Sequence, residues 1–210
     1  MKRRHRLGAI IIVGVITLSM VGLPVFSYFY GGGTPQATPS AANTYDPAQE
    51  FADLKSRAQA LTEAAKSNPD NLELQTQLGN TYYDLGTAAF DLAPADAKGY
   101  LEQAIAAYQA ALKGKKDISI TVDMATAAFY AGNNELAESG FQAALSENPN
   151  FYPALVNYGR FLYDAKKDYA TAMRVWQQAL NNSPSDQNKQ MLQSLIAAAQ
   201  GELQASLNGK

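Results

Sequence analysis

The sequence predicts an all-α fold of stacked antiparallel helix pairs, preceded by a single N-terminal transmembrane helix. Three observations lead to this prediction. Apolar residues recur at helical spacing through most of the chain after Asp46, a motif returns at intervals of 33 and 35 residues, and residues 7–30 contain no charged side chain. The length of 210 residues suffices for such an anchor and one ordinary domain.

The composition excludes most enzyme classes and disfavours nucleic-acid binding. The chain has no cysteine, and its only histidine, His5, lies in the basic N-terminal run, so thiolate sites, catalytic triads and multi-histidine metal clusters are excluded. Residues 1–6 hold four of the 17 basic side chains, which leaves 13 against 19 acidic ones. Such an acidic body does not suit a phosphate backbone. We therefore expect no catalytic residue, no cofactor, no metal and no nucleic-acid partner.

The N-terminal segments predict a membrane anchor. Residues 7–30 would form a helix of about 36 Å, against about 30 Å of bilayer hydrocarbon. The flanking residues 1–6 are basic, and no further basic residue follows until Lys55, so the positive-inside rule places the N-terminus in the cytoplasm and the body outside it. We expect a single-pass protein of the cell membrane. The alternative is a cleaved signal peptide and a secreted protein, although signal peptides have shorter apolar runs.

A tether and a capping helix are expected next. Residues 31–46 are rich in Gly, Pro, Ser, Thr and Ala, which predicts a flexible linker. Asp46 then stands as an N-cap before Pro47, with Gln49 as its capping-box partner. The following segment, 47–68, is expected to be an N-terminal capping helix. Its apolar residues recur on one helical face: Phe51, Leu54, Ala58, Leu61 and Ala65.

The body contains three copies of one pattern. Each copy has a small residue in the middle of a first helix, and then alanine, an aromatic residue and alanine at fixed spacing in a second helix. Four columns align: Ala104, Ala137 and Ala172; Tyr108, Phe141 and Trp176; Ala111, Ala144 and Ala179; and Leu112, Leu145 and Leu180. Small residues allow two helices to cross closely, and the aromatic side chain fills the remaining space. Pro149 and Pro184 end the second and third copies.

The pattern resembles the tetratricopeptide repeat, with Leu78-Gly79 and Tyr82 standing for its Leu-Gly-x-x-Tyr motif. The middle copy departs from it, with Ala125 for glycine and Ala128 for tyrosine. The resemblance implies a tetratricopeptide-type α-solenoid in residues 47–208. Its expected parts are repeat 1 (72–117), repeat 2 (118–151), repeat 3 (152–185) and a C-terminal capping helix (186–207).

The first repeat carries 13 additional residues between Gly86 and Gly99. We expect this insertion to lengthen both helices of the hairpin by about two turns, with Phe90 and Tyr100 near its tip. Two interpretations stay open. The longer hairpin either packs on the N-terminal helix as part of the core, or projects to bind a partner.

The resemblance also implies a concave groove, lined by the first helix of each repeat, that holds an extended or helical peptide. Aromatic residues on this face serve equally well to support the helix pairs. Asn80 and Arg160 are stronger candidates for binding, because a packed face has no evident use for them. Carried over by position, the groove residues are Thr76, Asn80, Tyr83, Asp84, Thr126, Phe129, Tyr130, Asn157, Arg160 and Tyr163.

We expect a non-catalytic membrane-anchored adaptor or assembly factor that binds segments of other envelope or membrane proteins. The topology is similar to that of bacterial membrane-anchored tetratricopeptide proteins. The first alternative is a structural subunit of an envelope complex that associates with copies of itself as a homo-oligomer. A more remote alternative is a membrane-anchored hydrolase, for which no nucleophile and base can be paired in this sequence.

Overall fold

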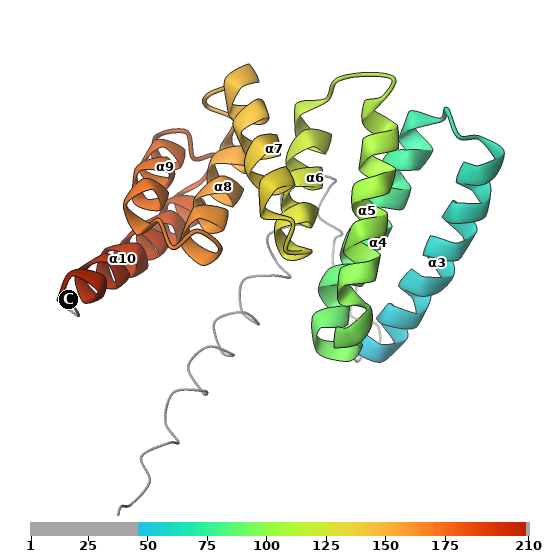
Figure 1. The fold of residues 1–210 in the computed structure, drawn as a ribbon, viewed down its shortest axis with the longest axis horizontal. Helices are drawn as coiled ribbons and strands as arrows, with labels where there is room; N and C mark the ends of the chain where they lie inside the picture. The colour runs from blue at the N-terminus through green and yellow to red at the C-terminus, as the bar shows by residue number, and fades with distance from the viewer. Residues whose placement is uncertain (1–45, 209–210) are drawn as a thin grey trace, which may run out of the picture. The chain divides into compact units, whose positions relative to one another are not determined.

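The computed structural model describes residues 46–208, and in that range the chain is all-helical, without a strand (Figure 1). The predicted all-α class is therefore confirmed. The helices, in chain order, are α3 (Pro47–Ser67), α4 (Leu72–Leu92), α5 (Pro94–Leu112), α6 (Ile118–Tyr130), α7 (Asn134–Glu147), α8 (Tyr152–Asp164), α9 (Tyr169–Asn181) and α10 (Asp186–Asn208).

The predicted anchor cannot be compared with this fold. The segments predicted as a cytoplasmic tail, a transmembrane helix and, up to residue 45, a linker lie outside the described residues. Within residues 46–208, none of the helices combines the length and the apolar character that a membrane crossing requires.

Short polar side chains start several of the helices. The Asp46 carboxylate accepts hydrogen bonds from the backbone N–H groups of Ala48 and Gln49, at 2.9 and 3.4 Å, which satisfies donors that have no partner inside α3. The side chain of Gln49 donates to Asp53 at 2.9 Å. The expected capping box is therefore replaced by a bond along the helix surface. Five further helices have side-chain caps of the same kind: Asn71, Asp117, Asn133, Asp168 and Ser185.

The helices pack as antiparallel neighbours. Helices α4 and α5, α6 and α7, and α8 and α9 form three hairpins, while α3 packs on α4 and α10 packs on α9. Contacts also join α4 to α6 and α6 to α8, so the first helices of the hairpins lie side by side. Figure 1 shows the hairpins following one another in chain order. This is the arrangement of helix pairs that the repeat pattern predicts.

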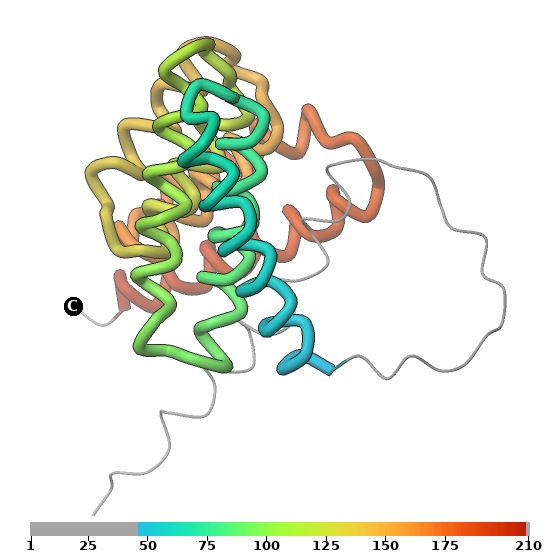
Figure 2. The backbone as a smooth tube through the Cα atoms, turned by 90° about the vertical axis from the view of Figure 1, so that its right-hand side faces the viewer, coloured from blue at the N-terminus to red at the C-terminus, as the bar shows by residue number. Residues whose placement is uncertain are grey.

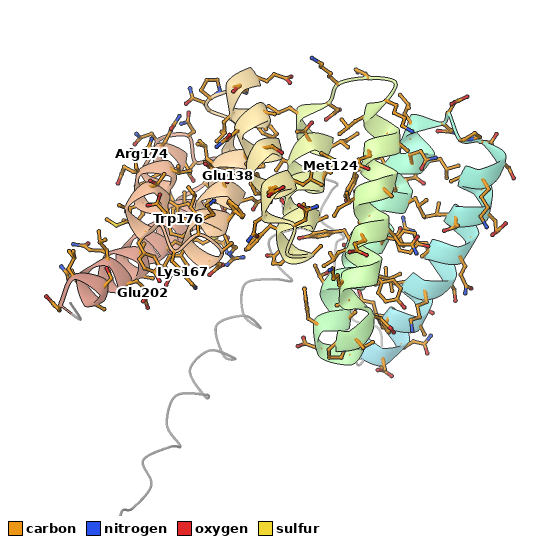
Figure 3. All side chains as sticks on the ribbon, viewed as in Figure 1. Met124, Glu138, Lys167, Arg174, Trp176 and Glu202 are labelled. Atoms are coloured by element: carbon orange, nitrogen blue, oxygen red, sulfur yellow. The ribbon has the colours of Figure 1, made fainter. Side chains whose placement is uncertain are left out.

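Glycine occupies the closest helix crossings. A Cβ atom added to Gly79 would lie 2.6 Å from the ring of Tyr108, and one added to Gly140 would lie 2.8 Å from the Cβ of Ala125. Gly159 sits against the indole of Trp176, whose Nε1 donates to the carbonyl of Val156 on α8 at 3.1 Å. Figure 3 shows Trp176 on α9 near the C-terminal end of the body.

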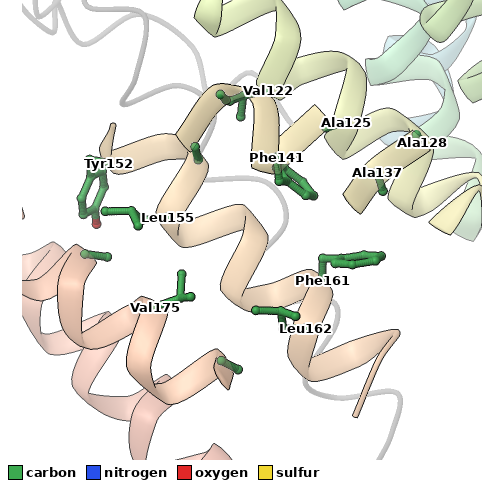
Figure 4. Close-up of a cluster of buried hydrophobic side chains, with 14 of the residues drawn as sticks. Val122, Ala125, Ala128, Ala137, Phe141, Tyr152, Leu155, Phe161, Leu162 and Val175 are labelled. Atoms are coloured by element: carbon green, nitrogen blue, oxygen red, sulfur yellow. The ribbon is translucent and has the colours of Figure 1, made fainter. Parts of the chain in front are cut away.

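The aromatic column of the repeats forms the centre of the core. Tyr108 and Phe141 are fully buried, Trp176 is 1% exposed, and the alanine columns beside them are buried as well. Phe141 lies 6.0 Å from Phe161 of α8, between ring centroids, and so joins the second hairpin to the third. Figure 4 shows these two rings close together inside the surrounding aliphatic side chains.

The first hairpin is longer than the others. Helices α4 and α5 contain 21 and 19 residues, whereas each helix of the next two hairpins contains 13 or 14. Helix α3 runs alongside this hairpin in both views (Figures 1 and 2). Tyr100 stacks on Tyr82 at 6.5 Å and meets Phe51 of α3 edge-on at 6.3 Å. The Tyr100 side of the insertion therefore packs on the N-terminal helix.

Candidate functional site

The ten predicted groove residues all lie on α4, α6 and α8. We call the surface formed by these three helices the first-helix face. Thr126 is buried, and the other nine residues are partly exposed. Two shallow hollows, of about 260 and 310 Å³, lie beside α5 and are lined by none of the ten residues. Because the ten residues are distributed over three neighbouring helices, the candidate site is an extended surface.

Four aromatic rings of α4 and α6 meet on the first-helix face. Tyr130 lies 6.2 Å from Tyr83, 6.2 Å from Phe90 and 4.9 Å from Phe129, between ring centroids. Phe90 is 40% exposed, and the other three rings are half-buried. We call Tyr83, Phe90, Phe129 and Tyr130 the aromatic patch. Rings arranged in this way offer a large apolar area to a partner at low cost in side-chain entropy.

The sequence prediction of the groove missed Phe90. Phe90 lies in the insertion, so it has no equivalent position in the other repeats. Its distance from Tyr83 could have predicted it, because Phe90 follows Tyr83 by seven residues. Two residues seven apart lie on the same side of an α-helix. The lengthened α4 thus extends the face by two turns, and Phe90 of this extension contacts Tyr130 of the neighbouring α6.

Several predicted groove residues hold the helices together. The carboxamide oxygen of Asn80 accepts a hydrogen bond at 2.8 Å from the hydroxyl of the buried Tyr108 on α5. The amide of Asn157 donates to Thr126 at 3.1 Å and so links α8 to α6. Thr76, in contrast, donates to the carbonyl of Leu72 at 2.8 Å, one turn back in the same helix. The argument that a packed face has no use for Asn80 is therefore wrong, because this packed face uses it to satisfy a buried hydroxyl.

The hydrogen bond between Tyr108 and Asn80 gives a prediction. Tyr108→Phe is expected to lower the free energy of unfolding by about 1–1.5 kcal/mol, because it leaves the half-buried oxygen of Asn80 without this donor. Urea unfolding of Tyr108→Phe, Asn80→Ala and the double variant measures the coupling. We expect a coupling energy of about 1 kcal/mol. Strictly additive effects would show that the two side chains stabilise the fold independently.

Tyr163 and Phe129 also have packing partners. Tyr163 lies 5.8 Å from the ring of Trp176 and 5.2 Å from that of Tyr169, so it supports the α8–α9 hairpin. Phe129 meets Phe161 edge-on at 5.7 Å while it stacks on Tyr130. Phe129 therefore has one side toward the core and one toward the aromatic patch. Tyr163 belongs to a separate aromatic contact at the other end of the face.

The first-helix face is acidic. Its three helices carry five carboxylates and one basic residue, Arg160. The Nε of Arg160 lies 4.0 Å from a carboxylate oxygen of Asp164, one turn away on the same helix. Burial raises the pKa of Tyr83. The neighbouring Tyr130, Asp123 and Asp84 raise this pKa further, whereas Arg160 lowers it. The five carboxylates are Glu73, Asp84, Asp91, Asp123 and Asp164.

Asp84 is a carboxylate in a poorly solvated position. Burial raises its pKa from 3.8 to about 6, with a lowering effect from the Arg57 guanidinium and a further raising effect from Glu50. Between these two pH values the folded state holds a proton that the unfolded state has lost. The free energy of unfolding therefore decreases as the pH rises from about 4 to about 6. Above that window, keeping Asp84 charged destabilises the fold.

The substitution Asp84→Asn tests this effect. It keeps the side-chain shape and removes the charge, so we expect the free energy of unfolding at about pH 7.5 to rise by about 1–2 kcal/mol, with little change near about pH 3, where Asp84 is mostly protonated in both the folded and the unfolded state. Urea unfolding at both pH values measures the difference. The exposed Asp91 on the same helix provides the matched control, and Asp91→Asn is expected to change stability by less than about 0.5 kcal/mol. An equal gain for Asp84→Asn at both pH values would contradict the proposed cause.

Comparisons with known proteins address the fold. No family model matches the chain, and no curated protein matches its sequence. Solved structures do match. The fold resembles that of MamA. One crystal structure of MamA aligns with a TM-score of 0.53 at 15% sequence identity, covering 80% of this chain and 99% of that one. A second crystal structure of MamA gives a TM-score of 0.48 at 19% identity, covering 76% and 84% of the two chains. At these identities the likeness to MamA shows the fold alone.

The described part of the chain offers little for metal chemistry. Across residues 46–208, no group of three or more histidine, cysteine, aspartate or glutamate residues is placed to hold a metal ion. The carboxylates of the first-helix face are distributed over three helices. Three of them act on tyrosines of the face: Asp84 and Asp123 on Tyr83, and Asp164 on Tyr163. This arrangement suits contact with another polypeptide, because aromatic side chains with a polar surround are typical of interfaces.

Proposed function

We propose that this chain is a non-catalytic adaptor or assembly factor of the tetratricopeptide type, which binds a polypeptide segment of another protein on the first-helix face. The aromatic patch is the observation that supports this function. It joins α4 and α6, it includes Phe90 with 40% of its surface exposed, and it lies on the helices that would line the groove according to the resemblance to the tetratricopeptide repeat. Partly exposed aromatic residues often act as anchors in protein interfaces.

The proposed setting is the outer side of a cell membrane. The support is the sequence alone: the basic residues 1–6 followed by the uncharged residues 7–30. In this setting the partners are other envelope or membrane proteins, held near the bilayer by residues 31–46 as a tether. Protease added to intact cells tests the orientation. We expect the body to be degraded, whereas protection of the body would place it inside.

A self-associating structural subunit is the second candidate. Its support is the sequence: the end segments 47–68 and 186–207 are amphipathic helices, which could pack against other copies of the chain.

Site-specific photocrosslinking in cells separates the two candidates. The full-length chain carries a benzophenone amino acid in place of Phe90 or, as a control, in place of the exposed Gln109 on α5. We expect adducts with another protein from position 90 and not from position 109. Adducts that join two copies of the chain would favour the structural subunit. Adducts from both positions, or from neither, would contradict binding on the first-helix face.

A further inference from the structure

We propose that the segment bound on the aromatic patch is basic: an extended stretch of polypeptide in which Lys or Arg alternates with apolar residues. This inference rests on the proposed function, and it names the chemistry of the partner. Two properties of the first-helix face support it. The first is the charge around the patch, and the second is the way in which the aromatic rings are exposed.

Carboxylates from two helices act on the same part of the patch. Asp84 on α4 and Asp123 on α6 both raise the pKa of the Tyr83 hydroxyl, so both charges are felt at this ring. Neither α4 nor α6 contains a basic residue. Arg57 of α3 offsets part of the charge of Asp84, while Glu50 adds to it. A partner with positive charge is therefore attracted to the patch, and an acidic partner is repelled.

The positive charge of the face is smaller than its negative charge. Arg160 of α8 is the one basic residue on the three helices. Its charge lowers the pKa of Tyr83 and so partly offsets the two aspartates there, and its Nε lies 4.0 Å from a carboxylate oxygen of Asp164. Because this carboxylate is one turn away on the same helix, Arg160 offers little net charge to an acidic segment. This differs from a binding site for carboxylates, where unpaired basic groups would be expected to converge.

The rings suit the long side chains of Lys and Arg. Phe90 is 40% exposed and lies beside Tyr130, so a partner side chain can lie on both rings. The aliphatic part of Lys or Arg packs on such apolar surfaces while its charged end reaches a polar neighbour. A cation close to an aromatic face gains further stabilisation from the ring. Apolar residues of the segment would cover the rest of the patch.

Binding would also relieve an unfavourable charge. The charged form of Asp84 is disfavoured by burial, as its raised pKa shows. A cationic side chain placed beside it would stabilise the charged form. In the absence of a partner, the charged form of Asp84 thus destabilises the folded chain. With a basic partner bound, the same carboxylate would make a favourable contact. Such a balance is typical of residues retained for binding rather than for stability.

Matched peptides test the inference on the full-length chain in zwitterionic detergent micelles. One fluorescent peptide alternates Lys with Leu, and the second has Glu in place of every Lys. We expect fluorescence anisotropy to show binding of the Lys peptide only, with an affinity that falls as the salt concentration is raised. Empty micelles report any binding to the detergent.

Charge variants locate the binding on the face. Asp84→Asn combined with Asp123→Asn is expected to weaken binding of the Lys peptide about tenfold, because two charge pairs are lost. Glu135→Gln combined with Glu147→Gln removes the same charge from the exposed surface of α7 and is expected to change the affinity less than about twofold. The control separates contact at the patch from the attraction of a negatively charged body.

Three outcomes would overturn the inference. These are binding of the Glu peptide as tightly as the Lys peptide, equal losses for the two double variants, or no binding of the Lys peptide up to about 100 µM. The proposed function has a separate test, since adducts formed at position 90 in cells do not depend on the charge of the partner. Adducts at that position together with failure of the Lys peptide would leave the function standing and remove the basic partner.

Discussion

The substitution Gly159→Ala is expected to lower the free energy of unfolding by about 2–4 kcal/mol. The new Cβ would overlap the indole of Trp176, which is 1% exposed and has no free space to move into. Moving the indole would also break its 3.1 Å hydrogen bond to the carbonyl of Val156. A buried N–H without a partner adds to the cost of the steric overlap. Urea unfolding, followed by circular dichroism, measures the loss.

Gly99→Ala is the matched control for this substitution. Gly99 lies in the interior of α5, and a Cβ added there would meet no atom within 4 Å. The same chemical change should therefore raise the free energy of unfolding by up to about 1 kcal/mol, because alanine is the better helix former. The two variants are thus expected to change stability in opposite directions. A loss of the same size at both positions would show that steric overlap with Trp176 is not the cause.

Phe161→Ala is expected to lower the free energy of unfolding by about 3–5 kcal/mol. Its ring is fully buried and contacts Phe129 of α6 at 5.7 Å and Phe141 of α7 at 6.0 Å, between ring centroids. Removing the ring opens a cavity at the junction of the second and third hairpins. Thermal unfolding should show a lower midpoint and a broader transition, because the two hairpins then unfold with less cooperativity.

Phe90→Ala removes the same ring from a surface position. Phe90 is 40% exposed, and among the residues that the structure describes its ring contacts one other ring, that of Tyr130, so the expected loss is at most about 1 kcal/mol. This comparison also separates stability from binding. Phe90→Ala should weaken binding of a partner while leaving the fold intact. Equal losses of stability for Phe90→Ala and Phe161→Ala would contradict the burial on which both expectations rest.

The helix pairs could be predicted because the information for them is local. A glycine such as Gly79 or Gly159 marks a close crossing, and the residue that covers it, Tyr108 or Trp176, belongs to the aromatic column of the repeat. Helix periodicity then decides which residues face inward. The caps follow the same principle, since Asp46 and Asn71 act on backbone groups within three residues.

The candidate site was harder to predict because its contacts join helices that are far apart in sequence. The hydrogen bond from Tyr108 to Asn80 spans 28 residues, and the bond from Asn157 to Thr126 spans 31. An amide side chain on a helix face can bind a ligand or its own neighbouring helix, and the spacing of the repeat does not distinguish these uses. Phe90 of α4 contacts Tyr130 of α6 because of the way in which the first two hairpins stack on each other. The sequence pattern of a single repeat does not predict this stacking.

The packing of each helix on its neighbours in the chain has a consequence for synthesis. Each hairpin needs mainly the segment just before it, so the contacts of the body are local in sequence. Proteins with such low contact order fold quickly, and their N-terminal parts can form before translation ends. The α3–α4–α5 unit should thus be in place while the ribosome is still producing α9. Its apolar edge would then be exposed only until the next hairpin emerges.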